Sequence, residues 1–215
     1  MKKTSFILGS ALIAGFFIIA ESCTKKSAEP LVCFQEDVLP LMISHCATSG
    51  CHNPVDHEEG YDFTSYEGIM KGVSKGHARR SEIVHVIREG EMPPAGYPQL
   101  TDDELTAIER WIDLGAVNSS NCNSGGCDTA VFTYSGAIQP MLQTYCVGCH
   151  YNGAPNAPYD LSNFTEVQGI ALNGVLTGVV NHENGYVPMP SNGPQLSDCQ
   201  RTVIQKWIDA GAPNN

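Results

Sequence analysis

The stretch CVGCH at residues 146–150 decides how this sequence is interpreted. It places two cysteines three positions apart, with a histidine directly after the second. A related stretch, CATSGCH at residues 46–52, ends in the same Cys-His pair but has four residues between its cysteines. Two thiols beside an imidazole can form a dithiol redox pair, contribute to a zinc site or attach a haem group covalently.

The spacing of Cys146, Cys149 and His150 favours haem. In the pattern C-x-x-C-H the two thiols form thioethers with the haem vinyl groups, and the adjacent histidine binds the iron. A dithiol redox site does not require that histidine and is expected near a βαβ pattern, which the sequence lacks. A zinc site would need two more thiolates or imidazoles, and the two related stretches do not supply matched ones.

The chain contains an internal duplication. DVLPLMISHC at residues 37–46 resembles GAIQPMLQTYC at residues 136–146. PQLTDDELTAIERWIDLGA at residues 98–116 resembles PQLSDCQRTVIQKWIDAGA at residues 194–212. The separation between matching residues falls smoothly from 100 at the first cysteine to 96 at the tryptophan. Only small loop differences therefore separate the two copies.

The duplication predicts two small domains, at residues 33–118 and 130–215. Residues 119–129 form the linker between them, because this segment is rich in Gly, Ser and Asn. In each copy we expect a short helix just before the first cysteine, with Pro40 or Pro140 in or near its first turn, where proline is tolerated. A long region rich in Gly, Pro and Asn follows.

Each copy ends in a helix with clear signals at both ends. The segments Thr101–Glu104 and Ser197–Gln200 are capping boxes, and Gly115 and Gly211 stand where a helix C-terminus favours positive φ. Two helices alone bury little apolar surface, so a large flat apolar cofactor is expected to complete each core.

Met92 and Met189 are the expected second axial ligands. They occupy matching positions in the two copies, and each stands directly before a proline, which favours extended backbone and a stiff loop. A methionine thioether paired with histidine is typical of electron-carrying cytochromes c. The competing ligands are His182 in the second copy and His77 or His85 in the first, which do not align with each other.

These motifs and their order resemble the planctomycete-type cytochrome c domain, a small domain similar to class I cytochromes c. The resemblance implies an all-α fold of two tandem domains, each with a few helices around a covalent haem c. By resemblance, one haem is held by Cys46, Cys51, His52 and Met92, and the other by Cys146, Cys149, His150 and Met189.

The wider spacing in the first copy leaves an alternative open. Cys46 and Cys51 could close a small disulfide, and the first copy would then bind no haem. Against this, the first copy retains His52, Met92 and the terminal helix. We therefore expect two haems, and one as the minimum.

The N-terminus predicts export. Residues 1–22 have a charged start and an apolar stretch, as a signal peptide does, and Cys23 follows as in a lipoprotein, with residues 23–32 as tether. Lipidation at Cys23 would place the chain on the periplasmic side of a bacterial membrane. The alternatives are an ordinary signal peptide or an uncleaved anchor, with Cys23 as a spare thiol.

Four further cysteines can form two disulfides in an exported protein. Cys33 and Cys122 flank the first domain, while Cys127 opens the second and Cys199 begins its last helix. We expect the pairs Cys33–Cys122 and Cys127–Cys199, although four cysteines allow three connectivities.

The net charge of −11 argues against nucleic acid as a partner, because polyanion binding needs clustered Lys and Arg. An acidic surface instead suits redox proteins with basic docking surfaces. The expected function is the transfer of single electrons between respiratory or periplasmic redox partners. The alternatives are a dihaem peroxidase-like enzyme and an accessory cytochrome subunit of a larger oxidoreductase.

Overall fold

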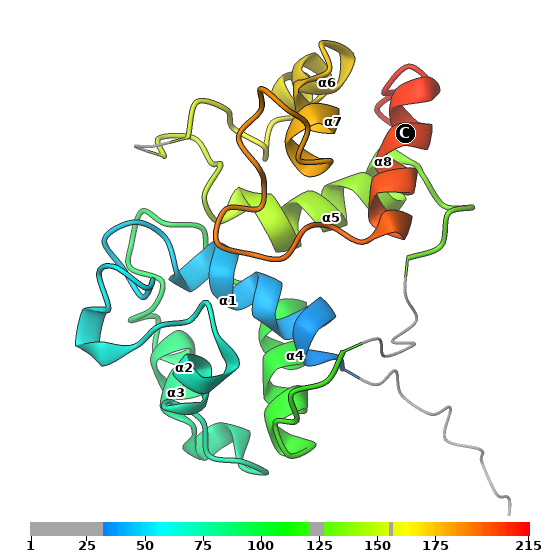
Figure 1. The fold of residues 1–215 in the computed structure, drawn as a ribbon. Coiled ribbons are helices and arrows are strands. Elements are labelled where there is room, and N and C mark those ends of the chain that lie inside the picture. Colours follow the sequence, from blue (N-terminus) through cyan, green and yellow to red (C-terminus); the bar gives the residue numbers. More distant parts are fainter. Residues whose placement is uncertain (1–31, 121–126, 155–156) are drawn as a thin grey trace, which may run out of the picture.

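The computed structural model describes residues 32–120, 127–154 and 157–215, and it contains helices and no strands in these segments (Figure 1). The predicted all-α fold is therefore confirmed for this part of the chain. The expected signal peptide, Cys23 and Cys122 lie outside the described residues. None of the described helices is long and apolar enough to cross a membrane.

The described chain contains eight α-helices, four in each half. Those of the first half are α1 (Leu39–Cys46), α2 (Tyr66–Met70), α3 (Glu82–Arg88) and α4 (Asp102–Asp113). Those of the second half are α5 (Gln139–Leu142), α6 (Phe164–Leu172), α7 (Val175–Val180) and α8 (Asp198–Asp209). The region expected as a long loop thus carries two helices in each half. These helices are too short to leave a clear periodic pattern in the sequence.

The two prolines lie inside longer helical runs. A π-helical turn at Phe34–Val38 leads directly into α1, and one at Tyr134–Ile138 leads into α5. The N–H of Leu39 donates to the Phe34 carbonyl, five residues back, and Pro40 follows at the change from π to α geometry. Pro40 and Pro140 therefore lie in the first turn of α1 and α5, as expected, and the π-helical turn before each was not predicted.

The terminal helices α4 and α8 form as predicted. The Thr101 side chain accepts from the Glu104 N–H, and Glu104 accepts from the Thr101 N–H; Ser197 and Gln200 repeat both bonds in α8. Gly115, just after α4, has φ of +104°, and Gly211 has φ of +90°. Each helix is therefore fixed at both ends by residues that the sequence marks.

The buried apolar residues form two clusters, one in each half. Each cluster is centred on three aromatic rings whose closest centroids lie 5.1 Å apart in the first half and 4.8 Å in the second. The rings are Phe34, Tyr66 and Trp111, and Tyr134, Phe164 and Trp207. The expectation that each copy lacks a core of its own was wrong, because the extra helices bring more apolar side chains inside.

In each half, the last segment of the chain is hydrogen-bonded to the first. The N–H of Gln35 donates to the Ser119 carbonyl at 3.0 Å, and that of Ser135 donates to the Asn215 carbonyl at 2.8 Å. The segment that follows each terminal helix therefore pairs with the segment that opens the first helical run. In Figure 1, α4 lies beside α1 and α8 crosses near α5, which reflects this closure.

Candidate functional site

The second cysteine motif curls into a tight turn at the end of the first helical run of its half. The N–H of His150 donates to the Cys146 carbonyl at 2.9 Å, and that of Cys149 donates to the same oxygen at 3.1 Å. The His150 carbonyl accepts from the Leu161 N–H at 2.9 Å. Backbone hydrogen bonds on both sides therefore fix the position of His150.

The first motif anchors its histidine in the same way, despite its two extra residues. The N–H of His52 donates to the Cys46 carbonyl at 3.1 Å, and the His52 carbonyl accepts from the Phe63 N–H at 2.8 Å. The insertion therefore bulges outward without moving the histidine away from the first cysteine. The two motifs are equivalent in the backbone hydrogen bonds on either side of the histidine, whereas the rings differ: Nδ1 of His150 is buried without a hydrogen-bond partner among the described residues.

Asn53 and Asp56 hold the enlarged loop. The Asp56 carboxylate accepts from the Gly50 N–H at 2.7 Å and from the Asn53 side-chain amide at 2.6 Å. The same amide donates to the Thr48 carbonyl at 2.9 Å. Gly50 has φ of +82°, a conformation suited to glycine.

Sequence reasoning missed Asn53 and Asp56. Asn53 is buried, and its side-chain oxygen accepts from the N–H groups of Val55 and Asp56. Asn followed by Pro is a turn signal, and the Asn side chain here closes such a turn. This signal could have identified Asn53 as the residue that organises the loop.

Both imidazoles are suited to bind a metal through one nitrogen. His52 Nδ1 lies 2.9 Å from the Glu58 carbonyl oxygen, to which it can donate, and this leaves Nε2 for a ligand. The His52 ring packs against Tyr61 and Phe63, with centroids 5.9 Å and 4.8 Å away. Burial lowers the pKa of His150, opposed by the Tyr159 carbonyl, and so favours the neutral ring that metals bind.

The four motif cysteines are free thiols, which are Cys46, Cys51, Cys146 and Cys149. Burial, with a smaller effect of the neighbouring thiol, raises the pKa of Cys46 and of Cys146 to about 12. Cysteines that exchange disulfides have lowered pKa values instead. The described residues also contain no group of three or more His, Cys, Asp or Glu that could hold a metal ion. The raised pKa values of Cys46 and Cys146 argue against dithiol exchange, and the fixed histidine beside each cysteine pair fits haem attachment.

Met92 and Met189 sit on matching loops. The Met92 N–H donates to the Val86 carbonyl at 3.1 Å, and the Met189 N–H donates to the Val179 carbonyl at 3.0 Å. Both methionines are half-buried, and both precede a proline joined by a cis peptide bond. The structure thus gives the two loops the same local form.

The competing histidines have other surroundings. His182 Nε2 lies 3.0 Å from the Met189 carbonyl oxygen, so this imidazole interacts with the methionine loop itself. His77 and His85 are exposed. His182 is exposed as well.

Gln99 supports the Met92 loop, and Gln195 binds the end of α7; the sequence analysis singled out neither. The Gln99 amide donates to the Pro93 carbonyl at 2.9 Å, while that of Gln195 donates to the Val180 carbonyl at 3.1 Å. Both belong to the repeated tripeptide PQL. Because this tripeptide recurs at matching positions, the duplication itself was the signal that could have found them.

Three further cysteines in the described segments, Cys33, Cys127 and Cys199, are disulfide-bonded. A disulfide joins Cys127 to Cys199, whose Cα atoms lie 6.0 Å apart, and so ties the start of the second half to α8. Cys122, the expected partner of Cys33, lies outside the described residues.

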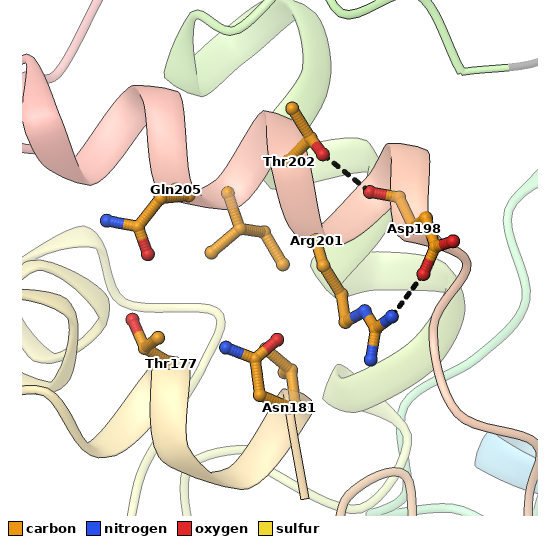
Figure 2. Close-up of a pocket in the computed structure, with 8 residues that line it drawn as sticks. Thr177, Asn181, Asp198, Arg201, Thr202 and Gln205 are labelled. Carbon is orange, nitrogen blue, oxygen red and sulfur yellow. Dashed lines mark hydrogen bonds and ion pairs between the residues drawn. The ribbon is translucent and has the colours of Figure 1, made fainter. Parts of the chain in front are cut away.

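A polar cavity of about 460 Å³ lies between α7 and α8 (Figure 2). Its lining includes Thr177, Asn181 and Gln205, together with Arg201, whose guanidinium pairs with the Asp198 carboxylate. None of the motif cysteines, histidines or methionines lines this cavity. It therefore has no part in the candidate site.

Comparison with protein families supports a cytochrome c-like domain. The family model for planctomycete cytochrome C matches residues 49–96, less than half of the chain. The matched stretch includes Cys51, His52 and Met92 of the first copy. No curated protein and no solved structure matches the chain.

Proposed function

We propose that the chain is a two-domain c-type cytochrome that carries single electrons, with one haem c in each half. The domains span residues 33–118 and 130–215. The observation that carries this proposal is the shared anchoring of the two histidines: His52 and His150 each donate a backbone N–H to the carbonyl of the first cysteine of their motif. The family match to residues 49–96 supports the same conclusion for the first half.

Different residues would hold different parts of each haem. The thiols of each motif would anchor the haem covalently, and the histidine together with Met92 or Met189 would bind its iron. When bound, haem iron supplies reversible one-electron oxidation and reduction. Tyr61 and Phe63 pack against the His52 ring and would help to keep it in place. If the chain supplies both iron ligands, a carrier is favoured over a peroxidase, which needs an open position at the iron.

The proposed location is the periplasmic side of a bacterial membrane, with Cys23 as the lipidated first residue of the mature chain. The N-terminal sequence supports this proposal. A lipid anchor would keep the carrier at the membrane surface, where electron donors and acceptors are concentrated. Partners with basic docking surfaces fit the net charge of −11.

The intact mass of the mature protein tests the proposal in one experiment. The chain is expressed in a bacterium with a cytochrome c maturation system, as wild type, as Cys46→Ala/Cys51→Ala and as Cys146→Ala/Cys149→Ala. We expect two haem masses in the wild type and one in each double variant. The mass of the N-terminal peptide shows whether the chain starts at a lipidated Cys23.

The two double variants serve as controls for each other, because each removes the same number of thiols. If the wild type and Cys46→Ala/Cys51→Ala both carry one haem, the first half is not a haem domain. An unmodified N-terminal peptide would contradict the lipoprotein assignment and leave the haem assignment unchanged.

A further inference from the structure

The two cysteine motifs meet where the two halves pack together. The Ser44 hydroxyl, near the end of α1, donates to the Thr144 carbonyl at 2.9 Å. The Tyr145 hydroxyl donates to the Glu36 carbonyl at 3.0 Å and accepts from the Gln200 amide at 2.9 Å. Figure 1 shows α1 and α5 next to each other at the centre of the molecule. Both helical runs end in a cysteine motif, so this contact lies at the candidate sites.

Gly148, inside the second motif, makes the closest approach. A Cβ atom at this position would lie 1.9 Å from the Ser44 carbonyl oxygen and 2.3 Å from its carbon. The backbone of Gly148 has φ of −56°, which any residue can adopt. Glycine is therefore required here by the packing of one half against the other, since the backbone conformation does not demand it.

The attachment residues themselves lie along this contact. The Sγ atom of Cys149 is 3.7 Å from the Ser44 carbonyl oxygen, and Ser44 precedes Cys46 by two positions. The rings of Tyr97 and Tyr151 have centroids 6.1 Å apart, and Tyr151 directly follows His150. The contact therefore places Cys149 of the second motif against the backbone just before Cys46 of the first motif.

We propose that the Ser44–Gly148 contact makes the two attachment sites one coupled redox centre, with Gly148 as the positioning residue. This inference rests on the proposed function, because it requires a haem in each half. The interaction of two charges grows as their separation and the surrounding dielectric constant fall. Ser44 and Gly148 are both buried, so water screens the contact poorly. An electron on one site should therefore disfavour the addition of an electron to the other.

No covalent bond in the chain forms or breaks in this process. Each step adds one electron from an external reductant to one site, and the oxidised form is recovered with an external oxidant. Dithionite and ferricyanide serve as reductant and oxidant in the test.

The test is a potentiometric titration of the full two-haem protein, followed by visible absorption. It is compared with titrations of the two single-haem variants described above. We expect the wild-type curve to be broader than the sum of the single-haem curves. Gly148→Ala, which forces the contact apart, should bring the curve back toward that sum. Gly169→Ala should not, because a Cβ at Gly169 meets nothing within 4 Å. Ser44→Ala keeps the carbonyl and should retain most of the coupling.

A second signature is independent of the potentials. In the fully oxidised wild type, electron paramagnetic resonance should show broadening from the interaction of the two irons, and Gly148→Ala should reduce it. A wild-type protein with two haems, an additive titration and no broadening would overturn the inference, even if Gly148→Ala failed to fold. A single haem by mass would instead overturn the two-haem function on which the inference rests.

Discussion

At the scale of single residues, the enlarged first motif depends on one carboxylate. Asp56 is exposed, yet it accepts hydrogen bonds from the Gly50 backbone and from the buried Asn53 side chain. These bonds, the one from Asn53 first, hold the pKa of Asp56 below its ordinary value. The ionised form is therefore the one that stabilises the loop before Cys51 and His52.

Replacement of Asp56 should weaken the first site and change its response to acid. The contribution of Asp56 to the free energy of unfolding is fully present above the ordinary aspartate pKa, and it is lost as the pH falls through the lower pKa of the folded state. We expect Asp56→Ala to lower the denaturant midpoint near neutral pH and to approach the wild type in strong acid. Denaturant unfolding from about pH 2 to about pH 7 measures this.

Glu58→Ala is the matched control, because it removes an exposed carboxylate and keeps the backbone carbonyl that faces His52. It should follow the wild-type pH profile. A constant difference between Asp56→Ala and the wild type at every pH would show that the carboxylate charge has no part in holding the loop.

The sequence predicted the residues that act locally and missed those that act through packing. Gly115 and Gly211 were assigned to positive φ because a helix end requires it, and the structure agrees. The role of Gly148 could not be predicted, since its backbone is ordinary and its constraint comes from Ser44, a residue about a hundred positions away. Asn53 and Asp56 act through the three-dimensional form of a loop that a linear pattern does not specify.

At the scale of the elements, α4 and α8 are the best-defined parts of the fold. Each has a reciprocal capping box, and each buries a tryptophan whose indole N–H donates to a backbone carbonyl beyond the helix, at 2.9 Å in both halves. The indole bond ties the helix to the segment that returns to the start of its half. The two terminal helices are therefore equivalent in their caps and in their anchoring.

Removal of either N-cap should cost similar stability. Thr101→Ala and Ser197→Ala each delete the hydroxyl that accepts from the third residue of the helix, which costs about 1 kcal/mol. Because the two caps share no partner, the double variant should lose about 2 kcal/mol. Denaturant unfolding of the haem-loaded protein measures both values.

Thr106→Ala is the comparison variant, since Thr106 is exposed within α4 and outside the cap. It should leave stability unchanged or raise it slightly, because alanine favours the helix interior. If Thr101→Ala lowers the free energy of unfolding no more than Thr106→Ala does, the cap does not contribute to stability.

The sequence predicted the long helices α4 and α8 and did not predict the short helices α2 and α7. The helices α4 and α8 have 12 residues each, and their capping boxes recur at matching positions in both copies. By contrast, α2 has five residues and α7 has six, so packing on the core decides their conformation. The π-helical turns before Pro40 and Pro140 also depend on the surrounding chain and leave no distinct sequence signal.

At the scale of the whole molecule, acidic residues outnumber basic ones by 23 to 12. Carboxylates also line the groove between the halves, among them Asp103, Glu104 and Asp128. A surface of this kind attracts basic partners over distances comparable with the Debye length. Docking of a redox partner should therefore respond strongly to ionic strength.

Electron transfer from the reduced protein to a basic acceptor protein should slow several-fold as salt rises from about 10 mM to about 500 mM. Stopped-flow absorption at low reactant concentration measures the second-order rate constant. A neutral small-molecule acceptor provides the comparison, because its rate should change little with salt. Equal salt dependence for the two acceptors would contradict charge-guided docking.

The closure of each half on itself has a consequence for rearrangement of the gene. Because Gln35 pairs with Ser119 and Ser135 with Asn215, the entry and exit of each unit are adjacent in space. A circular permutant that joins such ends and opens a surface loop should therefore keep the same contacts. The same adjacency allows a whole unit to be copied, deleted or inserted into a host loop without a long connecting segment. A duplication of such a segment therefore needs only a short linker between the copies.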